Sequence, residues 1–383
     1  MPVAQTGQGA WVVVISRGSR NGACPRGLDS HYRPRRYVSA IGFIGVIQTM
    51  ASATSGLRIA VVIPCYRVRD HVLGVIARVP AAVERIYCVD DGCPEGSGKL
   101  IEADCRDARV RVIFHDRNRG VGGAVKTGYL AAREDGCDVA VKIDGDGQMD
   151  PALLASFVRP IELGLADYTK GNRFYRMGDT RAMPGARLFG NAILSFFSKL
   201  STGYWNVFDP ANGYTALHLA VLDLVPIQRV ADRYFFESDL LFRLNIARCV
   251  VRDVPMIAVY AGEASNLSIR RIAFPFIGGH MRNFFKRIFY SYFLRDFHVA
   301  SIQALLGPVL LAAGVIFGGY HWWLSAGSGV PATPGTVMIA GLMIIVGVQL
   351  VLAALSFDIA NVPAQAVHPT LLALQEARKT WVE

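Results

Sequence analysis

The sequence has few cysteines, and they follow no pattern. The 383 residues include seven cysteines, which form neither a Cys-x-x-Cys pair nor the spacing of a zinc site. Thiols scattered in this way are typical of a protein that folds in a reducing compartment. We therefore expect packing cysteines in a domain that faces the cytoplasm. Internal repeats and low-complexity tracts are absent from the sequence as well.

Charged residues are also scarce, and two long stretches contain none. Asp, Glu, Lys and Arg make up only 18% of the chain, whose mean hydropathy is +0.31. Residues 302–324 and 337–357 are apolar runs of roughly 20 residues each, enough to cross the hydrocarbon core of a bilayer. Two buried core helices are the alternative. The lack of charge over this length favours two membrane spans.

The basic residues predict the orientation of these spans. The short connection between them, residues 325–336, has no Lys or Arg. Basic residues lie before the first span and after the second: Arg282, Lys286, Arg287, Arg295, Arg378 and Lys379. By the positive-inside rule, both flanking parts stay on the cytoplasmic side. We expect a multi-pass protein of the inner (cytoplasmic) membrane, with its large N-terminal part and its C-terminal tail in the cytoplasm.

Half of the net charge of +10 lies in the first 49 residues, which hold six arginines and one aspartate. This basic segment, followed by the apolar residues 38–50, resembles a signal peptide. Export would contradict the cysteine pattern and the charge bias. We therefore interpret residues 1–56 as a weakly structured N-terminal extension, with Met50 as an alternative start of the native chain.

From residue 57 onward, strand-like and helix-like segments alternate. Strand-like runs cover residues 58–64, 85–92, 109–115 and 138–147. Helical spacing covers residues 71–80, 98–107 and 120–136. This order predicts an α/β fold with a Rossmann-like, mostly parallel sheet joined by right-handed crossovers. Later segments are less regular, with helices expected at 186–201 and 232–247 and a strand at 249–260.

Ligands of such sheets bind beyond the carboxyl ends of the strands. Here these ends carry residues 64–66, the aspartates at 90 and 91, and residues 144–146. Asp144 and Asp146 stand one glycine apart, and carboxylates this close repel each other unless a cation or hydrogen-bond donors lie nearby. A solvated turn is the alternative. Three polar strand ends at one edge favour a divalent cation that holds a phosphorylated ligand.

Ahead of the first span, residues 280–298 combine apolar and basic side chains. On a helix, the basic residues would fall on one face. The apolar residues would fall near the opposite face: Met281, Phe284, Phe285, Ile288, Tyr292 and Phe293. Such a helix can lie in the headgroup layer of a membrane; a helix packed on the main domain is the alternative. The predicted order is an extension (1–56), an α/β domain (57–279), an amphipathic juxtamembrane helix (280–298), a two-helix transmembrane hairpin (299–358) and a cytoplasmic tail (359–383).

Four motifs, in this order and at these separations, carry a resemblance to a known family: VIPCY at 62–66, VDDG at 89–92, NRGVGGAVKTGY at 118–129 and DGDGQ at 144–148. They resemble family 2 glycosyltransferases of the GT-A fold. With two spans behind the domain, residues 57–357 look most like the polyprenyl-phosphate glycosyltransferases, the dolichyl-phosphate mannose synthase group. A Walker P-loop is excluded because Val125 stands where that motif needs a glycine. A dinucleotide fingerprint would have to follow the first strand, and none does.

The resemblance implies roles for residues that would bind the nucleotide of a sugar donor. Pro64 and Tyr66 would border the nucleotide base. Asp91, or alternatively Asp90, would hold the base or the ribose. Lys126, after the glycine-rich loop, would neutralise a phosphate.

The resemblance also implies a metal site in DGDGQ. Asp144, Asp146 and Gln148 would carry a metal ion and the donor diphosphate, with Asp146 as a catalytic residue. Oxygen ligands suit Mg²⁺ or Mn²⁺ rather than zinc. Such a cation would stabilise the negative charge that develops on a departing nucleoside diphosphate.

Acceptor residues follow from the same resemblance. Arg173 and Arg187 stand where the family's arginines would meet an acceptor phosphate, an anion that suits a guanidinium fork; surface salt bridges are the alternative. Asp209, in DPANGY, matches the family's acidic acceptor-side motif. Glu237 and Asp239 occupy the place of an acidic base. A phosphate acceptor is already ionised near neutral pH, so these carboxylates would only orient groups, and Asp209 is preferred among them.

The chain also departs from the family. Arg67 and Val68 replace the Asn-Glu that many relatives carry after the tyrosine, which leaves open how the base is held. Tyr260, Ser265 and Asn266 replace an Arg and a Ser-Lys pair near the membrane. The Gln-x-x-Arg-Trp motif of processive polymer synthases is absent from the sequence, which favours transfer of a single sugar.

Together these features predict a membrane-bound, metal-dependent, inverting glycosyltransferase of cell-envelope glycan biosynthesis. It would move one hexose from a GDP- or UDP-linked donor to a polyprenyl phosphate at the cytoplasmic face. Two alternatives are a transferase that acts on a lipid or glycan hydroxyl and a non-catalytic membrane scaffold that binds nucleotide sugars. No nucleic-acid partner is expected, and a homo-oligomer is left open.

Overall fold

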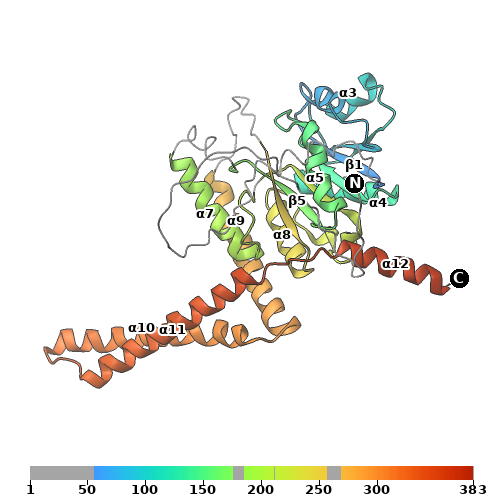
Figure 1. Ribbon diagram of the computed structural model, residues 1–383. Coiled ribbons are helices and arrows are strands. Elements are labelled where there is room, and N and C mark those ends of the chain that lie inside the picture. Colours follow the sequence, from blue (N-terminus) through green and yellow to red (C-terminus); the bar gives the residue numbers. More distant parts are fainter. Residues whose placement is uncertain (1–55, 176–184, 211, 257–268, 383) are drawn as a thin grey trace, which may run out of the picture. The chain divides into compact units, whose positions relative to one another are not determined.

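The computed structural model describes residues 56–175, 185–210, 212–256 and 269–382, without the side chains of residues 185–191, 269–274 and 381–382. Figure 1 shows the course of the chain. The predicted extension lies outside the described residues except for Gly56, and so does Met50 as an alternative start. Tyr260, Ser265 and Asn266 lie outside them as well.

Within the described residues, a seven-stranded sheet has the order β3-β2-β1-β4-β6-β5-β7. Four strands are parallel neighbours: β1 (Ile59–Cys65), β2 (Arg85–Asp90), β3 (Val110–Phe114) and β4 (Val139–Lys142). They are the four strands that the sequence predicts, and the α/β fold with a mostly parallel sheet is confirmed. Continuous apolar runs such as IAVVI in β1 form these strands because both faces of the sheet are covered.

Beyond β4 the sheet becomes mixed. β6 (Thr215–His218) runs antiparallel to β4 and to β5 (Tyr168–Asn172), whereas β7 (Val251–Pro255) runs parallel to β5. The sequence pattern predicts β7 but neither β5 nor β6. Both are short, and YTKGN and TALH lack the continuous apolar character of the first four strands.

Helices connect the parallel strands. α2 (Val72–Ala77), α3 (Ser97–Asp104) and α4 (Val121–Glu134) follow β1, β2 and β3, as the helical spacing predicts. The described part of the domain contains three further helices and three 3₁₀ turns: α5 (Leu154–Glu162), α7 (Gly185–Thr202), α8 (Phe236–Ile246), Pro151–Leu153, Leu219–Asp223 and Ile227–Arg229. α4 packs closely on the sheet at Gly128, where a Cβ would lie 2.3 Å from Val62 Cγ1.

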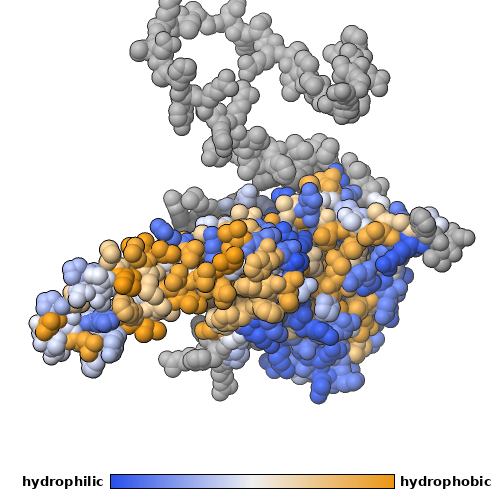
Figure 2. Space-filling model, turned by 90° about the horizontal axis from the view of Figure 1, so that it is seen from below, coloured by the Kyte–Doolittle hydropathy of each residue, from blue (hydrophilic) through white to orange (hydrophobic). Residues whose placement is uncertain are grey.

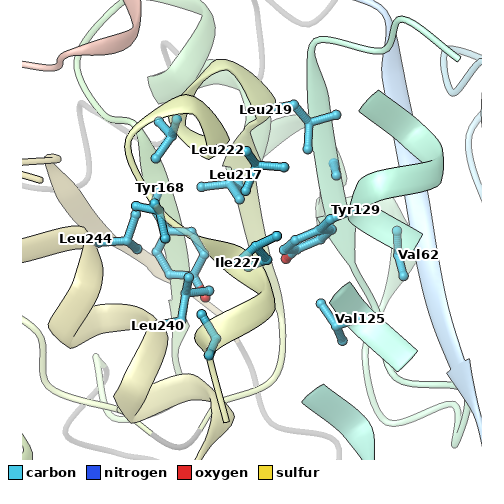
Figure 3. Close-up of a cluster of buried hydrophobic side chains, with 14 of the residues drawn as sticks. Val62, Val125, Tyr129, Tyr168, Leu217, Leu219, Leu222, Ile227, Leu240 and Leu244 are labelled. Carbon is cyan, nitrogen blue, oxygen red and sulfur yellow. The ribbon is translucent and has the colours of Figure 1, made fainter. Parts of the chain in front are cut away.

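Buried side chains cover both faces of the sheet. One cluster, drawn in Figure 3, joins β1 and β6 to α4 and α8: Val62, Val125, Tyr129, Leu217, Leu240 and Leu244. On the other face, Ile63 belongs to a second cluster in which Phe157 stacks on Tyr214, with ring centroids 3.9 Å apart. Close packing on two sides holds β1 and β4 in place, and with them the polar residues at their carboxyl ends.

Two helices among the described residues, α10 (Val299–Ser328) and α11 (Pro334–Ala360), are long and apolar enough to cross a membrane. The two predicted spans lie within them. Only 22% and 11% of their most apolar stretches are buried, unlike the helices of a protein core, and Figure 2 shows the apolar surface. The pair packs through small residues, since a Cβ on Gly347 would lie 2.6 Å from Leu311 N.

Ahead of them, α9 (Ile269–Phe289) continues into a π-helical turn, Tyr290–Arg295. The predicted amphipathic helix at this place stays a prediction, and α9 turns some of its polar side chains inward. Asn283 and Arg287 are buried, whereas Phe285 is 62% exposed. The inward polar groups have partners on neighbouring helices, and aromatic side chains of α9 remain on the surface.

Arg287 joins α9 to the end of α11. Its guanidinium donates hydrogen bonds to the Asp358 carboxylate at 2.6 and 2.9 Å. Tyr292 Oη and Trp205 Nε1 each donate to the same carboxylate at 2.8 Å. The single acidic residue of α11 is therefore fully paired, on the side of the α/β domain.

The chain after α11 returns to the α/β domain. α12 (His368–Val382) begins at a buried carboxylate, since Asp167 accepts hydrogen bonds from His368 N and Nδ1, each at 2.8 Å. The ring of His368 also stacks on the ring of His218, with centroids 4.3 Å apart. The segment that follows α11 is thus joined to the α/β domain that precedes α10.

His218 should make the stability of the domain sensitive to acid. Burial, together with the nearby His368, lowers the pKa of His218 from 6.5 to about 4. The stability that the neutral ring provides is complete above pH 6.5 and is lost as the pH falls through 4. His218→Asn keeps an acceptor for Ala220 N. We expect it to reduce the loss of unfolding free energy between pH 6.5 and 4 by about 2 kcal/mol. Urea unfolding at several pH values measures the free energy of unfolding. An equal loss in the variant and the wild type between pH 6.5 and 4 would contradict the prediction.

Candidate active site

A cleft of about 510 Å³ opens at the carboxyl ends of β1, β2 and β4. Its lining includes predicted residues from all three strand ends: Pro64, Tyr66, Asp91, Asp144 and Asp146. The structure thus brings the three polar strand ends to one edge of the sheet, where sheets of this kind bind ligands.

Asp91 holds the loop on one side of the cleft. Its Oδ1 accepts a hydrogen bond from Arg119 N at 2.9 Å and lies 2.7 Å from His115 Nδ1. Its Oδ2 accepts a hydrogen bond from Gly120 N at 2.7 Å. Gly120 has a φ of 92°, which a residue with a Cβ rarely adopts. The carboxylate therefore fixes the glycine-rich loop at the start of α4 while it lines the cleft.

Asp90 has a different place from its neighbour. Its Oδ1 accepts a hydrogen bond from Cys93 N at 2.7 Å, and its Oδ2 accepts one from Gly98 N at 2.6 Å. Successive residues of an extended chain point to opposite sides, so Asp90 and Asp91 cannot both face the cleft. Asp90 holds the start of α3, so of the two predicted alternatives the structure places Asp91 among the cleft residues.

The lining also contains two pairs of aromatic and basic residues, of which only Tyr66 belongs to one of the four motifs. Tyr66 is 41% exposed, and the guanidinium of Arg67 lies 5.6 Å from its ring centroid. Arg233 and Tyr234, between β6 and α8, line another part of the cleft. Such residues can stack on a base and attract phosphate. Arg67 follows a strand end and could have been suspected, whereas no local motif marks Arg233.

Asp144 and Asp146 both line the cleft, but Gln148 does not. The backbone N–H of Gln148 donates to Asp146 Oδ1 at 3.0 Å. Gly147, with a φ of 80°, allows the chain to turn there. Two of the three predicted metal ligands therefore lie in the cleft, and the third supports one of them through its backbone.

A buried lysine that no motif indicates lies against Asp144. Lys142, the last residue of β4, is 2% exposed. Its Nζ is 2.9 Å from Asp144 Oδ1 and 3.5 Å from Glu237 Oε1. Burial lowers the pKa of Lys142, but the carboxylates of Asp144 and Glu237 outweigh burial and raise it above its ordinary value. Its ammonium is therefore a fixed positive charge beside the cleft. A lysine within the apolar run VAVKI is the signal that could have revealed it.

Two of the predicted acceptor residues meet each other. Arg173 Nε donates to Asp209 Oδ2 at 2.7 Å, and its second guanidinium nitrogen donates to Oδ1 at 3.1 Å. Nearby on β5, burial lowers the pKa of Lys170 to about 8, and its Nζ donates to Asn212 O. Arg187 lies in α7, in the part of that helix whose side chains the structure does not describe.

Two other predicted residues are engaged elsewhere. Asp239 is 1% exposed and accepts hydrogen bonds from Asn283 at 3.0 Å and Arg243 at 3.2 Å, so it joins α8 to α9. Lys126 is 5% exposed, and its Nζ lies 2.5 Å from Asp232 Oδ1. Neither lines the cleft. The structure therefore places Asp239 and Lys126 outside the cleft lining, and their roles as a base and as a phosphate ligand stay predictions.

Comparison with known proteins identifies the family. Residues 60–225 match the family described as Glycosyl transferase family 2. The polyprenol monophosphomannose synthase of Mycolicibacterium smegmatis is 30% identical over 204 residues, which cover 52% of this chain and 76% of that protein. The chain belongs to glycosyl transferase family 2. It is an enzyme that transfers a sugar, and the family it was predicted to resemble is confirmed.

The glycosyltransferase is also similar to other known proteins. The UDP-N-acetylglucosamine–dolichyl-phosphate N-acetylglucosaminyltransferase of Methanococcus voltae is 29% identical over 216 residues, 53% of this chain and 86% of that protein. A crystal structure of glucosyl-3-phosphoglycerate synthase from Mycobacterium tuberculosis with Mn²⁺, UDP and glucosyl-3-phosphoglycerate has a TM-score of 0.46 and 18% identity. The matched part covers 67% of this chain and 86% of the synthase chain. The sheet of this glycosyltransferase is that of the GT-A fold.

The carboxylates of the glycosyltransferase fit a divalent metal ion. Asp144 and Asp146 present oxygen ligands to one cleft, the donor type that Mg²⁺ and Mn²⁺ prefer. Among the described residues, no group of three or more His, Cys, Asp or Glu side chains could hold a metal ion. The remaining ligands would therefore have to come from water or from a bound diphosphate.

Proposed function

We propose that this glycosyltransferase moves one hexose from a UDP- or GDP-linked donor to a polyprenyl phosphate. The observation that carries the proposal is an acidic cleft at the strand ends of a domain that is joined directly to two candidate membrane spans. Relatives support it, since three of them are named for transfer to dolichyl, polyprenol or undecaprenyl phosphates. The soluble donor would enter the cleft, while the acceptor would stay in the bilayer.

The donor side follows from the cleft. Tyr66, beside Pro64, would border the base, and Asp91 would hold the base or the ribose. Asp144 and Asp146 would hold Mg²⁺ or Mn²⁺, which stabilises the charge on a departing diphosphate when it is bound. Arg67 and Arg233 would add positive charge along the phosphates.

The acceptor side needs little chemistry from the protein. A phosphate monoester is ionised near neutral pH, so its oxygen can attack the anomeric carbon while the bond to the diphosphate breaks. This displacement inverts the anomeric centre and needs neither a covalent enzyme intermediate nor a general base. Arg173 would bind the acceptor phosphate, and Asp209 would orient its guanidinium.

The location follows from the flanks of α10 and α11. The α/β domain and the tail would lie in the cytoplasm, on the inner membrane, because basic residues precede α10 and follow α11. The attachment of α12 to the domain through Asp167 supports one common side for both segments. Exposed Phe285 and Lys286 on α9 would lie at the headgroups.

A hydroxyl acceptor is the second candidate, and it would need a general base. Glu237 is the residue that favours it, because its side chain is 14% exposed and lies 3.5 Å from the Lys142 ammonium, next to Asp144. Asp239 is less suited to this role, because it accepts a hydrogen bond from Asn283 of α9. A non-catalytic scaffold has no use for a pair of carboxylates that fits a leaving-group cation.

Labelled donors test the proposal. Membranes that contain the full chain are incubated with radiolabelled UDP- or GDP-hexoses, Mn²⁺ and an added polyprenyl phosphate. We expect label in the organic phase that mild acid releases, because a glycosyl phosphodiester is labile to acid. Acid-stable lipid label would contradict a phosphate acceptor and support a hydroxyl. Absence of label with every donor would contradict the activity.

A further inference from the structure

Lys142 lies where two carboxylates of the active site converge. Its ammonium is 2.9 Å from Asp144 Oδ1 and 3.5 Å from Glu237 Oε1, and the side chain is 2% exposed. Gly213 covers the pair, since a Cβ there would lie 2.4 Å from Asp144 Oδ2 and 2.6 Å from Lys142 Nζ. The lysine side of this ion pair is shielded from water, whereas the Asp144 side chain is 31% exposed and faces the cleft.

The consequence for cation binding is electrostatic. Asp144 and Asp146 bring two carboxylates to the cleft, and the Lys142 ammonium lies close enough to Asp144 to offset part of its charge. The described residues supply no third His, Cys, Asp or Glu for a metal ion at this place. A dication at these carboxylates would also be repelled by the buried ammonium a few ångströms away.

We propose that Lys142 is an internal counter-ion of Asp144 that keeps metal affinity low until a donor diphosphate is present. The inference rests on the proposed function and adds to it a positioning residue and an order of binding. A diphosphate brings oxygen ligands and further negative charge, so the metal and the nucleotide bind together. The same ammonium attracts the diphosphate when no metal is present.

Lys142→Met removes the charge and keeps the approximate volume of the side chain. We expect Mn²⁺ alone to bind about tenfold more tightly to this variant, because Asp144 loses its counter-ion. UDP and GDP without metal should bind about threefold more weakly, because a nearby positive charge is gone. Lys142→Arg keeps the charge and should restore both affinities to those of the wild type.

Lys170 provides a matched control. It is as deeply buried as Lys142, but its Nζ binds Asn212 O rather than Asp144. Lys170→Met should therefore change the affinity for Mn²⁺ by less than about threefold. If Lys142→Met does not fold, it can be combined with Glu237→Gln, which removes the charge of the second carboxylate that lost its counter-ion. Mn²⁺ should then bind about threefold more tightly than to the wild type.

The measurement uses the purified full chain in detergent and does not depend on turnover. Electron paramagnetic resonance of free Mn²⁺ gives the metal affinity, and calorimetry gives the affinities for UDP and GDP with and without Mn²⁺. Circular dichroism establishes that each variant is folded. Unchanged or weaker binding of Mn²⁺ to folded Lys142→Met would overturn the inference, as would Lys142→Arg behaving like Lys142→Met.

Failure of the inference and failure of the proposed function can be told apart. A wild-type protein that binds neither UDP nor GDP in the presence of Mn²⁺ contradicts the proposed function, and the inference falls with it. A wild-type protein that binds one of them, together with a Lys142→Met variant of unchanged metal affinity, contradicts the inference alone.

Discussion

Asp146→Asn should reduce hexose transfer about 10³-fold while the protein still folds and reaches the membrane. Asp146 lines the cleft, and its Oδ1 accepts a hydrogen bond from Gln148 N at 3.0 Å. Asparagine keeps the size of the side chain and one oxygen acceptor but has no negative charge. The loss would therefore reflect missing stabilisation of charge rather than altered packing. Initial rates with a labelled donor measure the effect.

Asp150 offers a matched control four residues further along the chain. Its Oδ1 accepts a hydrogen bond from Ala152 N at 3.1 Å at the start of a 3₁₀ turn, and it does not line the cleft. Asparagine caps such turns as well as aspartate does, so Asp150→Asn should stay within about twofold of the wild-type rate. A rate for Asp146→Asn within tenfold of the wild type would refute the role of Asp146.

Arg287→Met should lower the free energy of unfolding by about 3–5 kcal/mol, the largest stability effect that we expect in this chain. The guanidinium and the Asp358 carboxylate are 3% and 8% exposed, with 2.6 Å between their nearest atoms. Removing the arginine leaves a buried carboxylate without its counter-charge, which is far more costly than losing an exposed pair. Thermal and denaturant unfolding of the detergent-solubilised protein measure the loss.

Neutralising both Arg287 and Asp358 shows whether the loss of stability comes from the missing interaction or from the buried carboxylate left without a counter-charge. Arg287→Met combined with Asp358→Asn should recover most of the lost stability, because no buried charge remains. Glu84→Gln, which breaks the exposed pair with Arg58, should leave the unfolding midpoint close to that of the wild type. If the double variant is no more stable than Arg287→Met, the explanation by an unpaired charge is wrong.

The parallel half of the sheet could be predicted because its information is local. β1 and β4 are unbroken apolar runs, and each ends in polar residues. β5 could not be predicted, because its strand conformation depends on distant partners. Thr169 donates to Phe157 O at 2.8 Å, and Lys170 donates to Asn212 O, so two polar residues become acceptable inside the sheet only after the chain has folded.

The candidate site divides in the same way. The motifs place Asp91, Asp144 and Asp146 correctly in one cleft, because these residues follow strands whose order is evident. Glu237 and Asp239 are two residues apart on α8 and therefore point in different directions, toward Lys142 and toward α9. Their sequence separation alone could not tell which of them approaches the cleft.

The attachment of the chain on both sides of α10 and α11 limits how the domain could move under the proposed function. Asp358 is gripped by Arg287, Arg248 donates to Asn361 O at 2.8 Å, and Asp167 holds the first residue of α12. The chain is thus attached to the α/β domain both before α10 and after α11. If α10 and α11 cross a bilayer as proposed, a domain attached in this way would keep nearly the same height and tilt above it, and the phosphate of the proposed lipid acceptor would have to move to the cleft.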